Sequence, residues 1–156
     1  MKKVILIICL LFLVTGCVVK EMSKATITNN NGDKETLTGK ELCNIHNENE
    51  AKFKELYVGS KISFDGTVKK VNSYFYLAPD KKTIFDSIEF NEGFIVYVQH
   101  NQYELISDLS KGDKLHIESN IYSGFGCSSG IDIRGTDKVG GYDYSTLNKT
   151  IIEKID

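Results

Sequence analysis

The sequence predicts a mainly β domain, and three observations support that prediction. Residues 61–71 alternate between polar and apolar side chains, the period of a half-buried antiparallel strand. Residues 94–99 are apolar at nearly every position, as expected of a central strand. Turns containing Gly93 and Gly112 separate runs of this kind. About 120 residues follow the N-terminal region, enough for one compact core.

A helix is expected before the strands. Thr38 and Glu41 have the spacing of a capping box, which marks the start of a helix. Gly59 provides a natural stop. Between them, apolar residues recur near the helical period at Leu42, Ile45, Phe53 and Leu56.

Five strands are predicted after this helix. They occupy residues 61–71, 73–77, 94–99 and 114–122, and a short run at Ile131 and Ile133. Residues 83–90 are expected to add a hairpin arm, and the apolar spacing in residues 102–109 predicts a short helix between strands three and four. This order is that of the OB-fold, a five-stranded Greek-key barrel. The predicted fold is therefore an OB barrel preceded by an amphipathic helix.

The N-terminus has the layout of a secretory signal. Lys2 and Lys3 precede an apolar run over residues 4–14, which is shorter than the roughly 20 residues that a membrane span requires. The run ends in Val-Thr-Gly-Cys, which resembles the lipobox of bacterial lipoproteins, whose cysteine receives a diacylglycerol. We expect a signal peptide over residues 1–16 and a lipid anchor, including palmitate, on Cys17. A chance apolar N-terminus is the alternative.

The lipid anchor would place the protein on the extracytoplasmic face of the cell membrane. Residues 17–37 are polar and include three consecutive asparagines, so we expect a flexible tether there. The OB domain with a C-terminal extension then occupies residues 38–156.

The charge of the chain bears on its partners. Removal of Lys2 and Lys3 with the signal leaves 17 of the 19 basic side chains against 21 acidic ones, a net charge near −4. Nonspecific binding to nucleic acid depends on basic residues that displace counterions from phosphate. A nucleic-acid partner is therefore not expected.

Two cysteines, Cys43 and Cys127, remain after signal removal and lipidation. Outside the cytoplasm they can form a disulfide. The alternative is two separate thiols that pack as small apolar groups. Their spacing in the sequence leaves both possibilities open.

No pattern points to catalysis, a metal or a cofactor. Residues 126–130 satisfy G-x-S-x-G, but that motif requires the strand and helix of an α/β-hydrolase sheet. His46, His100 and His116 lack partners at metal-ligand spacing, and His116 is expected on the solvated surface. A nuclease on the same barrel would need clustered acidic and arginine residues, and Arg134 is the one arginine of the chain.

Three tyrosines form the candidate ligand-binding set. On the predicted second and third strands, the alternation of side chains places Tyr74, Tyr76 and Tyr97 on the outward face. OB-folds use this face to bind oligonucleotides and oligosaccharides. Aromatic rings on such a face stack on bases or sugars. The alternative is that they pack beneath the hairpin arm or the N-terminal helix.

Two stretches of the sequence, residues 48–71 and 109–124, resemble a known family. Residues 57–61 (YVGSK) and 64–68 (FDGTV), together with 109–113 (LSKGD), are similar to turns and a strand of the tRNA-anticodon-binding-like OB-fold family of bacterial lipoproteins. The resemblance covers about residues 40–135. The sequence differs from the family pattern in the long connection between strands two and three, at Cys127 and in the last twenty residues. It implies a fold and does not imply an activity.

The function expected from these observations is ligand binding without catalysis. The ligand would be an envelope glycan or a protein. A scaffold lipoprotein that assembles a membrane complex is the alternative, and an OB-type nuclease is a weaker one.

Overall fold

The computed structural model describes residues 23–78, 81–99, 106–123, 127, 130–134 and 150–156. For residues 74–78, 81–85, 99 and 123 only the backbone is described. The predicted signal peptide and Cys17 lie outside these ranges. In the described ranges the fold is mainly β, with eight strands in one sheet and two helices. In chain order the elements are β1 (Ala25–Thr28), β2 (Lys34–Leu37), α2 (Gly39–Glu48), α3 (Glu50–Tyr57), β3 (Lys61–Ala78), β4 (Lys81–Phe90), β5 (Phe94–Gln99), β6 (Lys114–Ser123), β7 (Ile131–Arg134) and β8 (Ile151–Ile155).

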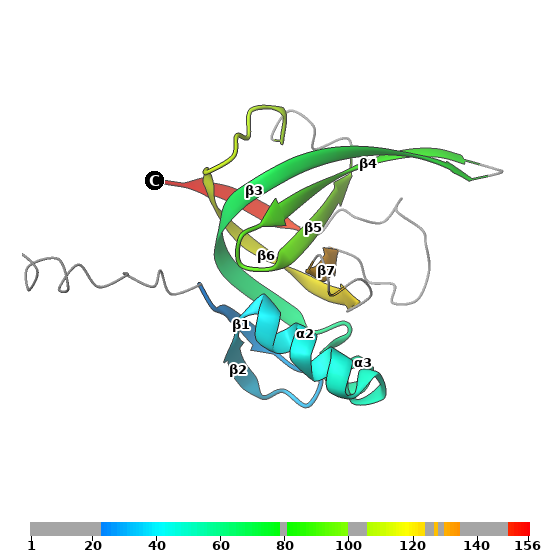
Figure 1. Cartoon of the computed structure of the whole chain (residues 1–156), viewed down its shortest axis with the longest axis vertical. Helices are drawn as coiled ribbons and strands as arrows, with labels where there is room; N and C mark the ends of the chain where they lie inside the picture. The colour runs from blue at the N-terminus through cyan, green and yellow to red at the C-terminus, as the bar shows by residue number, and fades with distance from the viewer. Residues whose placement is uncertain (1–22, 79–80, 100–105, 124–126, 128–129, 135–149) are drawn as a thin grey trace, which may run out of the picture.

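The strand order in the sheet is β2-β1-β3-β4-β5-β7-β6-β8, and β3 also pairs with β6. The pairings are antiparallel except that of β5 with β7, which is parallel. Figure 1 shows β3 curving through the whole molecule. Its first part lies between β1 and β6, and its last part extends beyond the body as a long hairpin with β4.

The separate strands predicted over residues 61–71 and 73–77 are one continuous strand of 18 residues, β3. Asn72 does not interrupt it, because its backbone pairs with Ser87 and its side-chain amide donates a 2.9 Å hydrogen bond to Glu89. The register shifts between Val68 and Lys70, and such a bulge bends a strand. β3 is thereby able to leave β6 and continue beside β4. The hairpin arm predicted over residues 83–90 is present as β4, whereas β1, β2 and β8 were not predicted as strands.

The N-terminal hairpin overturns the prediction of a flexible tether for residues 25–37, which form β1 and β2. The asparagines order the connecting turn. The Asn29 side-chain oxygen accepts hydrogen bonds from the backbone N–H groups of Asn31 and Asp33, each 3.0 Å long. Asparagine favours turns through this type of local bond. The folded domain therefore includes Ala25 and does not begin at residue 38.

The predicted helix is present as two helices. The capping box between Thr38 and Glu41 is confirmed, with the Thr38 hydroxyl accepting from the Glu41 backbone N–H at 3.2 Å. The return hydrogen bond, from the Thr38 backbone N–H, lowers the pKa of the Glu41 carboxyl. Asn49 separates the helices and caps α3 by accepting from the backbone N–H of Lys52 at 3.0 Å. Asparagine favours this capping position over the helix interior.

The hydrophobic core draws most of its side chains from the strands and the rest from the two helices. On β3, Phe64 packs edge-to-face against Phe90, with ring centroids 5.2 Å apart. Gly66 makes room for this pair, because a Cβ there would lie 2.5 Å from the Phe90 ring. The helices contribute the buried side chains Leu42, Cys43, Phe53 and Tyr57.

Two further segments correspond to predicted elements. The helix predicted over residues 102–109 is described only from residue 106, where Ile106 and Ser107 are helical and Ile106 is buried. In the C-terminal extension, Ile151 and Ile152 begin β8, which pairs with β6. No helix in the described part of the chain is long and apolar enough to cross a membrane.

Candidate functional site

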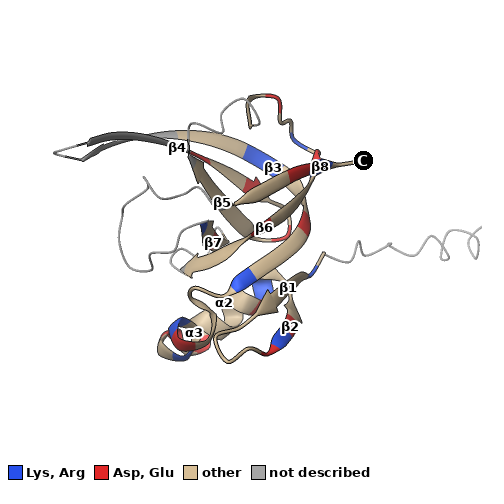
Figure 2. Cartoon of the chain, turned by 180° about the vertical axis from the view of Figure 1, so that it is seen from behind, with Lys and Arg blue, Asp and Glu red and all other residues tan. Residues whose placement is uncertain are grey.

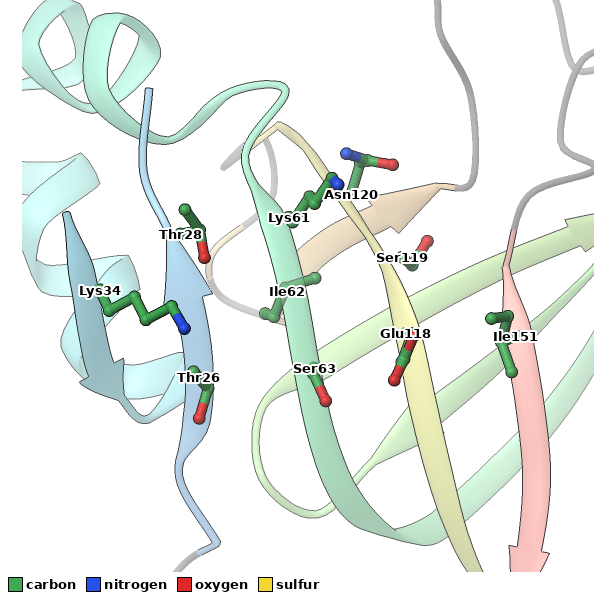
Figure 3. Close-up of a pocket in the computed structure, with 10 residues that line it drawn as sticks. All are labelled: Thr26, Thr28, Lys34, Lys61, Ile62, Ser63, Glu118, Ser119, Asn120 and Ile151. Carbon is green, nitrogen blue, oxygen red and sulfur yellow. The ribbon is translucent and has the colours of Figure 1, made fainter. Parts of the chain in front are cut away.

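A polar groove with a volume of about 530 Å³ lies over β1, β3 and β6. Figure 3 shows the side chains that line it, which come from β1, β2, β3, β6 and β8. Most of the lining side chains carry hydroxyl, amide or charged groups, and they are Thr26, Thr28, Lys34, Lys61, Ile62, Ser63, Glu118, Ser119, Asn120 and Ile151.

The strand register arranges most of these residues in two rows across the sheet. The first row is Lys34, Thr28, Lys61 and Asn120, which are neighbours by successive pairing. The second row is Thr26, Ser63, Glu118 and Ile151. Neighbouring strands lie about 4.8 Å apart, so each row presents a regular series of polar groups.

The alternation of β3 explains why these polar groups face the groove. Ile62 and Phe64 are buried in the core, whereas Lys61 is exposed and Ser63 is half-buried. Side chains on a strand alternate between the two faces of the sheet. The pattern that predicted the strand thus also produces the polar face.

Charge is distributed unevenly in the groove. Lys34 and Lys61 belong to the first row and Glu118 to the second. Figure 3 shows the Lys61 side chain extending toward β6 near Asn120. Among the described residues, no acidic side chain forms an ion pair with either lysine. Within the described part of the chain, both ammonium groups can therefore interact with a ligand in the groove.

A histidine lies between two carboxylates beside the groove. His116 on β6 has its Nδ1 atom 2.6 Å from Asp65 and its Nε2 atom 3.4 Å from Glu118. The hydrogen bond with Asp65 is the main cause that raises the pKa of His116. The prediction that His116 faces outward is confirmed, since its side chain is 30% exposed.

Of the three tyrosines expected to bind a ligand, Tyr97 is the one with a described side chain, and it does not line this groove. Tyr97 on β5 is half-buried, and the Arg134 guanidinium lies 4.5 Å from its ring centroid. The same guanidinium lies 3.9 Å from the ring centroid of Tyr122. Tyr74 and Tyr76 have their backbone in the β3–β4 hairpin, but their side chains lie outside the described residues. The proposed stacking role of these two side chains stays a prediction.

The two cysteines that could pair lie close together. The Cys43 thiol donates a 3.4 Å hydrogen bond to the backbone carbonyl of Cys127, and both are free thiols in the structure. Burial, with the neighbouring Cys127 as the second cause, raises the pKa of the Cys43 thiol to about 12. Burial also raises the pKa of Cys127.

The remaining candidate motifs add no second site in the described residues. Only Cys127 and Gly130 of the G-x-S-x-G stretch are described. His46 lies on α2 against the ring of Phe53, with centroids 5.2 Å apart, and His100 is not described. No three His, Cys, Asp or Glu side chains gather as metal ligands in the part of the chain that the structure describes.

The sequence reasoning missed residues at both ends of the groove. Thr26, Thr28 and Lys34 fall in the segment expected to be a tether, and Ile151 falls in the C-terminal extension. A signal for the first group was present. An Asn-Gly pair at residues 31–32 follows an alternating run, which is a strong hairpin indication.

The arrangement suits recognition of a polar molecule. Donors and acceptors are spread over a curved face of the sheet, and Ile151, which is 47% exposed, offers one apolar contact. Figure 2 shows basic residues on β2 and at the start of β3, interspersed with acidic ones. The groove therefore presents hydrogen-bond donors and acceptors together with local charges of both signs.

Comparison with known proteins identifies a family. No curated protein and no solved structure matches the chain at a significant level. The model of the family described as tRNA_anti-like matches residues 1–125, which is most of the chain and includes β1 to β6. The chain therefore belongs to the tRNA_anti-like family.

Proposed function

We propose that this chain is a lipid-anchored, extracytoplasmic OB-fold module that binds an envelope glycan in the polar groove, without catalysis. The observation that carries the proposal is the groove itself, with two rows of polar side chains and two lysines that have no acidic partner in the described residues. Its volume lies in the range of pockets that hold small organic ligands.

The strand pairings support the OB barrel. Successive pairing runs from β3 through β4, β5, β7 and β6 and returns to β3, with β5 and β7 parallel. This is the closed circuit expected of a five-stranded Greek-key barrel. β1, β2 and β8 would then extend the barrel sheet and widen the face on which the groove lies.

The position of β1 limits how far the domain can stand from the membrane. Ala25, the first residue of β1, follows the expected lipidated Cys17 by eight positions. An extended chain spans at most about 3.6 Å per residue, so this connection reaches roughly 30 Å. A short connection favours a ligand that is part of the membrane-proximal envelope.

The groove chemistry favours a glycan that carries amide and carboxylate groups. Hydroxyl and amide side chains exchange hydrogen bonds with sugar hydroxyls and acetamido groups. Lys34 and Lys61 can each bind a carboxylate, and a hydrogen bond to a charged group is among the stronger ones. Peptidoglycan fragments have both kinds of group.

A binding titration tests this proposal. We would record amide NMR spectra of the protein with peptidoglycan fragments, with a neutral oligosaccharide and with a single-stranded oligonucleotide. Saturable shifts of groove residues with the peptidoglycan fragments alone are the expected result. The double variant Lys34→Ala/Lys61→Ala should then weaken binding at least about tenfold.

A matched lysine outside the groove provides the control. Lys52→Ala removes an exposed lysine of α3 and should leave the affinity unchanged. Spectra that no probe perturbs would refute the glycan proposal. Equal binding by the double variant and the unmodified protein would place the ligand elsewhere.

The sheet edges favour a scaffold as the second candidate. β2 and β8 each stand at an end of the strand order and have one described neighbour. An open strand edge can pair with a segment of another protein. Co-purification of a protein partner that is lost when an edge strand carries a proline, with no response to the glycan probes, would favour this function.

A further inference from the structure

Two thiols approach each other where α2 meets the chain between β6 and β7. Cys43 lies in α2 and is 8% exposed, whereas Cys127 is half-buried. The Cys43 sulfur lies 3.4 Å from the Cys127 carbonyl oxygen, to which its thiol donates a hydrogen bond. In the thiol form, the Cys43 side chain is thus in contact with the backbone of Cys127.

Close backbone packing holds the two segments in place. At the start of α2, a Cβ on Gly39 would lie 2.6 Å from the carbonyl oxygen of Glu92. Gly130 packs on the same turn, where a Cβ would lie 2.8 Å from the carbonyl oxygen of Gly93. The backbone N–H of Ile131 donates a 2.9 Å hydrogen bond to that same carbonyl. The turn between β4 and β5 therefore fixes both the helix and the segment that follows Cys127.

We propose that Cys43 and Cys127 are a disulfide-forming pair that cross-links α2 to the connection between β6 and β7. The bond would close a loop from residue 43 to residue 127, which contains α3 and β3 to β6. This inference is independent of the groove and of its ligand. It requires an oxidant of the disulfide class, such as oxidised glutathione or an oxidised dithiol protein.

The accessibility of the two thiols sets the order of the reaction. Cys127 is the more exposed and attacks the oxidant as a thiolate, forming a mixed disulfide and releasing one thiol. Cys43 then attacks the Cys127 sulfur and releases the second thiol. Two electrons and two protons pass from the cysteine pair to the oxidant, so one disulfide is formed and one is consumed. Burial raises the pKa of Cys43 to about 12, which makes Cys43 the poorer first nucleophile. Its attack on the mixed disulfide is intramolecular, and this proximity offsets its low thiolate fraction.

The cross-link would act on the helix that covers one end of the core. α2 buries Leu42 and Cys43, and detachment of the helix would expose both. A disulfide restricts the unfolded chain most when the closed loop is long. The oxidised protein should accordingly resist thermal unfolding better than the reduced protein.

Oxidation of the full chain in mild detergent tests the proposal. After incubation with oxidised glutathione, free thiols are alkylated under denaturing conditions and the protein is digested without reduction. Mass spectrometry should detect a peptide pair joined through Cys43 and Cys127, about 2 Da lighter than the two thiol peptides because two hydrogens are lost. The melting temperature should fall by about 10 °C on addition of dithiothreitol.

Single variants test whether these two cysteines form the cross-link. In Cys127→Ser, which changes the half-buried member of the pair, the cross-linked peptide should be absent and dithiothreitol should no longer lower the melting temperature. Cys43→Ser should behave in the same way. The comparison of oxidised and reduced unmodified protein does not depend on the folding of either variant. Recovery of Cys43 and Cys127 as alkylated thiols, or as separate glutathione adducts, would overturn the proposal.

Discussion

The Tyr57 hydroxyl donates a 2.8 Å hydrogen bond to the Glu35 carboxylate and thereby joins α3 to β2. The second carboxylate oxygen of Glu35 accepts a 2.7 Å hydrogen bond from the side-chain amide of Asn29. Tyr57 is 4% exposed, and its burial, with the Glu35 carboxylate as the second cause, raises the pKa of its hydroxyl to about 12. One carboxylate thus connects the N-terminal hairpin to the helical layer.

Removal of the Tyr57 hydroxyl should weaken this connection. We expect Tyr57→Phe to lower the free energy of unfolding by about 1–2 kcal/mol, because the Glu35 carboxylate loses a partner in a half-buried place. Urea denaturation monitored by circular dichroism measures the change. Glu35→Gln retains an acceptor and should cost less. An unchanged midpoint for Tyr57→Phe would show that water replaces the hydroxyl without loss.

The side chain of Asn30 should matter more than that of its neighbour Asn31. The Asn30 amide donates to the backbone carbonyls of Glu55 at 2.7 Å and Val58 at 3.0 Å, which lie at the end of α3. We expect Asn30→Ala to lower the free energy of unfolding by about 1 kcal/mol, since these carbonyls lose their partner. Asn31→Ala is the matched control, because its exposed side chain takes part in neither bond. Equal effects of the two variants would contradict the capping role of Asn30.

The His116 site should make stability depend on pH. Its pKa in the folded protein is raised above the ordinary value of 6.5, first by the hydrogen bond with Asp65 and then by Glu118. The protonated form is favoured by folding, so its stabilisation is complete below pH 6.5 and is lost as pH rises through the folded pKa. NMR titration of the imidazole protons measures that pKa. Asp65→Asn should lower it, and a pKa that does not move would refute the pairing.

The N-terminus of α2 should not tolerate a side chain at Gly39. A Cβ would lie 2.6 Å from the Glu92 carbonyl oxygen and would also clash with that of Gly93. Both are backbone atoms, so relief requires the helix or the turn to move. We expect Gly39→Ala to lower the free energy of unfolding by about 1–3 kcal/mol. Thermal denaturation measures this, with the exposed Lys40→Ala as control, and equal stability of the two variants would exclude the close approach.

A strand can be predicted where its apolar residues follow a clear pattern. It is harder to predict where consecutive polar residues form the adjoining turn. β5, β6 and the start of β3 follow their apolar patterns closely. The capping box of Thr38 and Glu41 also follows local chemistry. The N-terminal hairpin is harder to predict, because consecutive asparagines are typical of unstructured segments. Their hydrogen bonds to backbone groups 25 or more positions away are not visible in local composition.

The candidate site is less predictable than the fold, because it depends on register. Lys34, Thr28 and Lys61 are neighbours only after β1, β2 and β3 have paired. Alternation along β5 correctly places the Tyr97 side chain on the opposite face of the strand from the buried Val96 and Val98. It could not indicate that Arg134, far along the chain, would occupy one face of the ring.

The C-terminal strand contributes to the groove from outside the part of the chain that the family match covers. The family match ends at residue 125, whereas β8 begins at Ile151 and contributes that residue to the rim of the groove. The floor of the groove thus comes from the part of the chain under the constraints of the shared fold. On the proposed function, substitutions in β8 would therefore alter ligand preference while leaving the strands within the family match unchanged.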